Sequence, residues 1–148
     1  MDNDTRQLYF RLFNEIGIIA QLSRAAMELR LPRGLTLPHF SVVNHLTRVR
    51  DGQTPLALAR AFQVPKTTMT HTLAGLLEHG FVEMRPNPED GRSKTVWLTQ
   101  SGRTFREEAI RSIDPDIEML QTAISADRIG EVLPVLAEIR AFMDSARN

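Results

Sequence analysis

The fold class follows from residues 54–80, which read TPLALARAFQVPKTTMTHTLAGLLEHG. A threonine followed by a proline is a typical helix start, with the hydroxyl as N-cap and the proline in the first turn. Apolar residues at helical spacing predict a helix over 55–62, a three-residue break, and a second helix over about 66–79 that stops at a glycine. The second helix is expected to bury Met69, Leu73, Leu76 and Leu77.

The periodicity changes after this second helix. Residues 81–85 and 94–98 are rich in aromatic and β-branched side chains, which is typical of short strands. The eight residues between them, PNPEDGRS, contain too many turn formers for a helix, so the unit is predicted to be a β-hairpin. Two short helices followed by a hairpin are the order of a winged helix-turn-helix. In that fold the second helix enters the major groove of DNA.

Helices are predicted on both sides of this unit. They cover residues 5–29 and 37–49 before it, residues 103–123 with a kink at Asp114-Pro115, and a last segment capped by Ser125. The apolar stripe of the first helix is wider than one side of a lone helix needs, which indicates a partner surface. The alternative is a monomer whose C-terminal part folds back. The fold class is therefore mainly α with a small α+β part: a winged helix-turn-helix with N- and C-terminal dimerisation helices.

Composition limits the class of protein. The chain has 148 residues, of which 42% are hydrophobic and 24% charged, as expected for one soluble domain. Its longest apolar run, residues 16–20, is too short to span a bilayer, so a cytoplasmic protein without membrane contact is predicted. The absence of cysteine excludes disulfides, thiolate catalysis and cysteine-based zinc sites from this chain.

The charge is distributed unevenly along the chain, although the formal net charge is zero. Residues 30–50 carry four arginines and no acid, and residues 54–106 carry seven basic against four acidic side chains. Residues 107–131 carry two basic against seven acidic ones. Arginine supplies 16 of the 18 cationic side chains, which favours fork-shaped contacts with phosphates and bases. Charge alone leaves a solvated surface as an equal alternative.

Five short motifs in a fixed order carry a resemblance to a known family. They are GLTLPHF at 34–40, the helix-turn-helix text from Leu58-Ala59 to Thr67-Thr68-Met69-Thr70, LLEHGFV at 76–82, DGR at 90–92 and LTQSG at 98–102. Together they resemble the MarR-type winged helix-turn-helix transcriptional regulators, and the match extends over about residues 5–145.

The resemblance implies a single domain over residues 1–148. Residues 34–103 would form the DNA-binding part, and residues 5–30 and 104–146 the dimerisation helices. It further implies a homodimeric, sequence-specific regulator that binds a pseudo-palindromic operator in double-stranded DNA. Such a protein is expected to act as a repressor that a small aromatic acid effector releases.

Candidate DNA-binding residues lie at the start of the second helix and on the hairpin. They are Lys66, Thr67, Thr68, Thr70, His71, Arg85, Arg92 and Lys94. Hydroxyls can contact phosphates or bases, and cations suit phosphates. In the family the arginine matching Arg92 enters the minor groove, and Asp90 would orient it through a salt bridge. The alternatives are a threonine-rich helix cap and a solvated loop pair.

The resemblance also implies an effector pocket, while no catalytic or metal site is expected. The pocket would be lined by Phe13, Ile16, Gly17, Phe40, Asn44 and His45, although plain core is the favoured interpretation for each of them. The four histidines have no metal-ligand spacing, no nucleophile or paired-carboxylate motif occurs, and no cofactor is predicted. Two alternative functions stay open: a winged-helix protein-interaction module and a DNA-binding regulator that senses no ligand.

Overall fold

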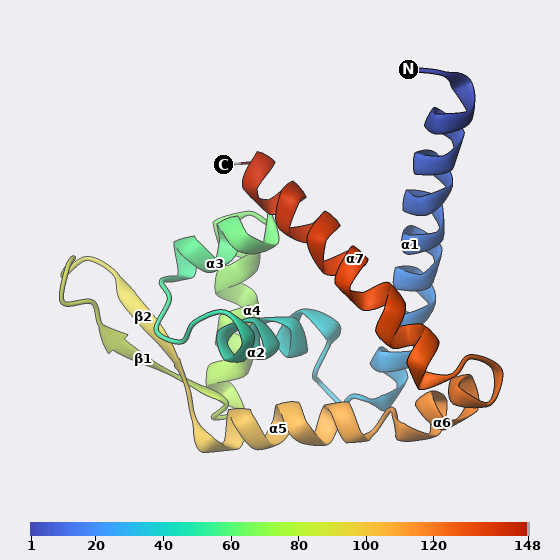
Figure 1. The fold of residues 1–148 in the computed structure, drawn as a ribbon. Helices are drawn as coiled ribbons and strands as arrows, with labels where there is room; N and C mark the ends of the chain where they lie inside the picture. Colours follow the sequence, from blue (N-terminus) through green and yellow to red (C-terminus); the bar gives the residue numbers. More distant parts are fainter. Residues whose placement is uncertain (148) are drawn as a thin grey trace. The chain divides into compact units, whose positions relative to one another are not determined.

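The computed structural model describes residues 1–147 and divides into two compact units (Figure 1). Unit 1, Met1–Ser112, contains α1 (Asn3–Arg30), α2 (Leu37–Arg48), α3 (Pro55–Phe62), α4 (Lys66–Glu78), β1 (Val82–Pro86), β2 (Lys94–Leu98) and α5 (Gln100–Arg111). Unit 2 begins at Ile113 and contains α6 (Asp114–Ala123) and α7 (Ala126–Ala146). This element order confirms the predicted fold class, a mainly helical chain with one small antiparallel sheet.

The strand β2 is paired along both of its edges. On one edge it runs antiparallel to β1, with Val82 opposite Leu98. On the other edge the Val96 N–H donates to the Gln53 carbonyl at 2.8 Å, and the Gly52 N–H donates to the Val96 carbonyl at 3.0 Å. The loop between α2 and α3 therefore acts as a third, very short strand that joins the hairpin to the start of α3.

Asp51 connects the same loop to β2 and α5. One carboxylate oxygen accepts the Leu98 N–H at 3.0 Å and the Gly52 N–H at 3.0 Å. The other oxygen forms an ion pair with Arg103 at 3.3 Å. One side chain thus fixes a loop, the end of a strand and the first turns of a helix relative to one another.

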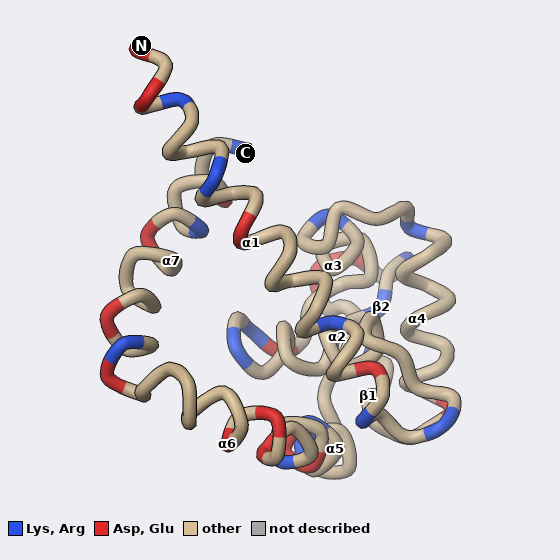
Figure 2. Tube along the Cα trace, turned by 90° about the vertical axis from the view of Figure 1, so that its right-hand side faces the viewer, with Lys and Arg blue, Asp and Glu red and all other residues tan. Residues whose placement is uncertain are grey.

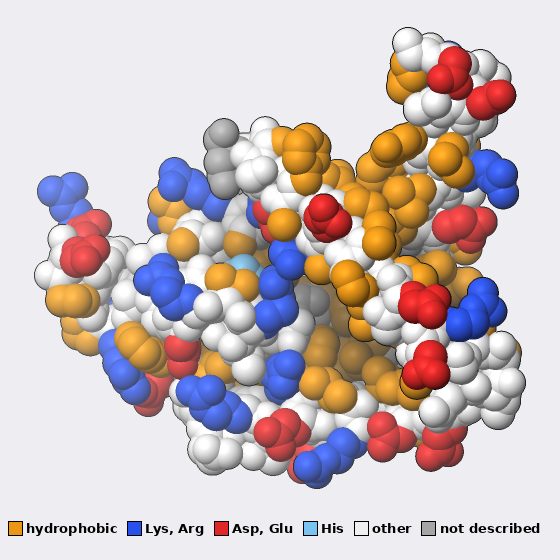
Figure 3. Space-filling model, viewed as in Figure 1, with side chains coloured by type: hydrophobic (Ala, Val, Ile, Leu, Met, Phe, Trp, Pro, Cys, Tyr) orange, Lys and Arg blue, Asp and Glu red, His pale blue; other side chains and the backbone are white. Residues whose placement is uncertain are grey.

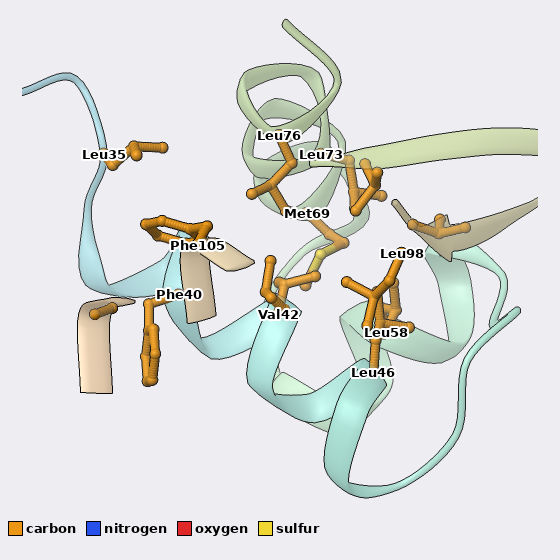
Figure 4. Close-up of a cluster of buried hydrophobic side chains, with 14 of the residues drawn as sticks. Leu35, Phe40, Val42, Leu46, Leu58, Met69, Leu73, Leu76, Leu98 and Phe105 are labelled. Atoms are coloured by element: carbon orange, nitrogen blue, oxygen red, sulfur yellow. The ribbon is translucent and has the colours of Figure 1, made fainter. Parts of the chain in front are cut away.

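The hydrophobic core of unit 1 lies where α2, α3, α4, α5 and the sheet meet (Figure 4). Its most completely buried large side chains are Leu46, Leu58, Leu76, Val42, Val43 and Val96. Phe105 of α5 stacks on Phe81 with ring centroids 4.6 Å apart and meets the edge of the Phe40 ring at 6.5 Å. This burial stabilises α3 and α4, because helices of 8 and 13 residues would not be stable alone in water.

The helix α4 ends as predicted at Gly80, but one of its predicted core residues is exposed. Gly80 has a φ of +71°, and the Gly80 and Phe81 N–H groups donate to the Leu77 and Leu76 carbonyls at 3.0 and 2.9 Å. This is a Schellman turn. The turn brings Phe81 back over the core, which leaves Leu77 outside with 40% of its surface exposed. The prediction that Leu77 is buried was therefore wrong.

The predicted kink near Asp114-Pro115 is a break between two helices. The helix α5 ends at Arg111, and α6 begins at Asp114 with Pro115 in its first turn, where a proline needs no hydrogen-bonding partner. In unit 2 the predicted cap is confirmed, since Ser125 Oγ accepts the Arg128 N–H at 3.4 Å. Among the described residues, no helix has the length and apolar character needed to cross a membrane.

Gly102 provides a sharp test of this packing. A Cβ atom at this position would collide with the backbone carbonyl of Phe81, which the adjacent turn holds in place. We expect Gly102→Ala to lower the free energy of unfolding by about 1–3 kcal/mol or more, because a buried backbone cannot move aside cheaply. Gly91→Ala is the control, since a Cβ there meets nothing within 4 Å. Urea denaturation at one protein concentration measures both, and equal stabilities for the two variants would contradict this account of the packing.

Candidate nucleic-acid interface

The turn between α3 and α4 is built from local signals. Thr54 Oγ1 accepts the Ala57 N–H at 3.1 Å and caps α3, as predicted. The helix ends at Gln63, whose φ of 53° and ψ of 44° are left-handed, and the Val64 N–H returns to the Ala59 carbonyl at 3.0 Å. Pro65 then precedes α4. This short, hydrogen-bonded turn confirms the predicted helix-turn-helix.

The start of α4 presents one polar face to solvent. Its candidate contact residues are all exposed: Lys66, Thr67, Thr68, Thr70 and His71. Met69 and Leu73, at 3% and 2% exposure, face the core, as the periodicity predicts. The Thr70 hydroxyl donates to the Lys66 carbonyl at 2.9 Å, which fixes its rotamer while its oxygen can still accept a hydrogen bond. The helix therefore offers a rigid row of small polar groups.

The hairpin carries Arg92 at its tip and fixes the loop around it. The Asn87 side-chain amide donates to Ser93 Oγ at 2.9 Å across the loop. Asp90 Oδ1 accepts the backbone N–H of Arg92 at 3.0 Å. Within residues 1–147, the predicted salt bridge between the Asp90 and Arg92 side chains is not formed. Asp90 thus shapes the loop backbone, and the exposed guanidinium of Arg92 is available to a ligand.

The other two candidate cations of the hairpin differ in their surroundings. Lys94, at the start of β2, is exposed. Arg85 donates from Nε to Glu83 Oε1 at 2.9 Å, and its guanidinium carbon lies 4.5 Å from the centre of the Trp97 ring. The sequence interpretation overlooked Glu83 and Trp97. Strand periodicity could have found them, because residues 83 and 85 share a face and residue 97 pairs with residue 83.

Figure 2 marks these lysines and arginines in blue along the chain trace. In Figure 2, basic residues in blue and acidic residues in red occur together along α5. Among the described residues, no group of three or more histidine, aspartate or glutamate side chains is placed to hold a metal ion.

The residues predicted to line an effector pocket are distributed over α1 and α2. Phe40 belongs to the core, Asn44 Oδ1 accepts a hydrogen bond from Arg106 Nε at 3.0 Å, and the His45 ring lies 5.2 Å from the Phe62 ring. On α1, Phe13 is 46% exposed. A hollow of about 210 Å³ lies elsewhere in unit 1, lined by Arg24, Leu37, Pro38, Ser41, Val42, Phe62, Val64, Thr68, Met69 and Thr72.

His39 joins α2 to α4, beneath the polar face. Its Nδ1 accepts the Thr36 N–H at 2.9 Å and so completes the capping box at the start of α2. Its Nε2 faces α4, where a Cβ on Gly75 would lie 2.5 Å away. Burial lowers the pKa of His39 below its ordinary value, and the nearby His79 and His71 lower this pKa further. The neutral imidazole is thus the form that fits.

Comparisons with known proteins agree with this geometry. Residues 33–93 match the model of the MarR family. A solved MarR family transcription regulator is 25% identical, with 98% of this chain and 96% of that chain covered and a TM-score of 0.70. The apo form of wild-type MarR from E. coli is 25% identical over 86% of this chain and 96% of that chain, with a TM-score of 0.72. A mutant of the E. coli protein complexed with operator DNA is 24% identical over 94% and 99% of the two chains, with a TM-score of 0.67.

The position of His39 between α2 and α4 predicts that the stability of the protein depends on pH. The pKa of His39 is lower in the folded state, so the unfolded chain binds the proton more readily. The stability that neutral His39 contributes is therefore complete above about pH 6.5 and is lost as the pH falls. The matched variant is His39→Gln, which keeps a capping acceptor without a titrating group. Urea titrations at pH 7.5 and 5.5 should show a smaller loss of stability for the variant. Equal losses of stability in wild type and in His39→Gln would show that this pH dependence does not come from His39.

Proposed function

Because this chain belongs to the MarR family of transcriptional regulators, we propose that it is a homodimeric repressor that binds a two-fold symmetric DNA operator. The observation that carries the proposal is the placement, within one compact unit, of the exposed polar face of α4 and the arginine at the hairpin tip. A helix start of this kind suits base edges in the major groove, and an arginine on a hairpin suits a narrow minor groove.

The two long helices support the homodimer. Neither α1, with 28 residues, nor α7, with 21, contains a buried residue, although both carry large apolar side chains. The exposed ones include Leu8, Tyr9, Phe10, Phe13, Ile18, Ile19 and Leu22 on α1 and Val132, Leu133, Val135, Phe142 and Met143 on α7. Figure 3 shows hydrophobic side chains gathered along α1. A second copy of the chain would cover such surfaces in a closed, two-fold assembly.

We further propose that a small aromatic acid releases the repressor from DNA. The proposed pocket is the one predicted from the family, formed by Phe13, Ile16 and Gly17 of α1 with Phe40, Asn44 and His45 of α2. The contact between Asn44 and Arg106 supports this choice, because it places a guanidinium beside residues that would surround an aromatic ring. A carboxylate pairs well with such a group.

The hairpin tip provides a direct test of DNA binding. Arg92→Ala should weaken binding by about 1–3 kcal/mol, most strongly where A·T-rich sequence flanks the site, because a narrow minor groove attracts arginine. Arg111→Ala is the control, since it removes an exposed arginine at the end of α5, away from the hairpin in sequence. Fluorescence anisotropy titrations at fixed salt measure both. The minor-groove role would be ruled out if the two variants bound A·T-flanked duplexes equally well.

The dimer predicts the form of the operator. Two recognition helices related by a two-fold axis must meet the major groove on one face of the duplex, so half-site centres should lie about 10–10.5 base pairs apart, or a multiple of this spacing. Genomic fragments captured by the purified protein in physiological salt supply the DNA, and footprinting reads the protected region. Light scattering on the same sample should give twice the 16.8 kDa chain mass. Protection of a single half-site, or a 17 kDa particle, would contradict the dimeric mode.

A further inference from the structure

A groove of about 310 Å³ lies between the start of α3 and the loop end of the hairpin. Its lining includes two arginines from different elements, Arg50 before α3 and Arg85 on β1, together with Thr54, Asn87 and Trp97. Glu89 also lines the groove, and Arg85 is paired with Glu83, so the two arginines have two acidic neighbours. Two arginines that line one groove are suited to bind a phosphate oxygen.

Trp97 is fixed at the floor of this groove. Its indole N–H donates to Thr95 Oγ1 at 2.9 Å, and the Thr95 hydroxyl donates to the Arg85 carbonyl at 3.3 Å. The ring also packs on Gly52, where a Cβ would approach within 2.5 Å of the ring carbons. Gly52 has a φ of +71°, so both the backbone and the ring require glycine at this position. The indole therefore has one defined orientation.

Trp97 in turn orients Arg85. The guanidinium stacks over the ring at 4.5 Å, and its Nε and one Nη donate to the same oxygen of Glu83. An arginine has five N–H donors. The bonds to Glu83 use the Nε–H and one N–H of a single Nη, and the remaining N–H groups can bind a ligand. A guanidinium held in this way loses little conformational entropy when it binds.

We propose that Trp97 is a positioning residue for DNA binding: it holds the Arg85 guanidinium in the groove so that Arg85 and Arg50 together receive one phosphate of the DNA backbone. This inference rests on the proposed DNA-binding function. A phosphate contact fixes the register of the protein on the duplex and carries no sequence preference. The effect should therefore appear with any duplex.

A double-mutant cycle tests the positioning role. The probe is a 30-base-pair duplex of mixed sequence at low salt, titrated with wild type, Arg85→Ala, Trp97→Leu and the double variant. We expect each single change to weaken binding about threefold to tenfold, as cation–π and phosphate contacts of this kind would predict. The double variant should bind like Arg85→Ala alone. Arg85→Ala should also lower the slope of log K against log salt by about one, as should Trp97→Leu.

A purely structural role for Trp97 predicts a different result. Trp97→Leu would then weaken binding by the same factor with Arg85 present or absent and would leave the salt slope unchanged; either finding would overturn the inference. If Trp97→Leu does not fold, Trp97→Phe is used in the same cycle, because phenylalanine binds a cation more weakly than tryptophan. Arg111→Ala is the charge control: it removes an exposed arginine that does not line the groove, so its effect should add to that of Trp97→Leu.

Tryptophan fluorescence gives an independent measurement. Trp97 is the only tryptophan in the 148 residues, so all indole emission reports on this groove. Adding the duplex should change the emission of wild type and should change that of Arg85→Ala much less. An equal change in both would count against the inference. If wild type binds no duplex at all, the proposed function fails; if wild type binds and the cycle is additive, only the role of Trp97 fails.

Discussion

The relative placement of all the candidate DNA contacts depends on the double pairing of β2. Val96 is fully buried, faces Met84 of β1, and exchanges backbone hydrogen bonds with Gln53 and Gly52 on its other edge. A slip of one residue would turn Val96 out of the core, so the register is strongly fixed. The hairpin and the loop that starts α3 therefore behave as one rigid frame, which sets the distance between Arg92 and the polar face of α4.

Within this frame the protein presents two arginines by different physical means. Asp90 uses its carboxylate on the backbone of the hairpin loop, so Arg92 is placed by main-chain geometry and its side chain is free to adjust to a groove. Arg85 is held by its side chain, between Glu83 and Trp97. An adjustable contact suits DNA whose groove width varies with sequence, whereas a fixed contact suits the regular spacing of backbone phosphates.

The parts of the structure that could be predicted from sequence are those with local causes. Caps such as Thr54 and Ser125, the glycine that ends α4 and the periodicity of its buried face all act within one turn of a helix. The features that could not be predicted join residues distant in the chain. Asp51 binds the N–H of Leu98, which is 47 residues away, and Trp97 needs the bare backbone of Gly52. No local propensity signals such contacts.

The exposed apolar helices bear on both the proposed assembly and the proposed DNA binding. A helix as long as α1 obtains most of its stability from packing, yet α1 contains no buried residue, and Met27 near its C-terminal end lies against the core of unit 1. In the proposed dimer, a second copy of the chain would cover the rest of α1. Met27 and Leu37 of α2 pack against the same core, and His39 of α2 lies against the α4 backbone at Gly75. Because α2 contacts both α1 and α4, a ligand that changes how α1 packs in the proposed regulator would act on α4 through α2.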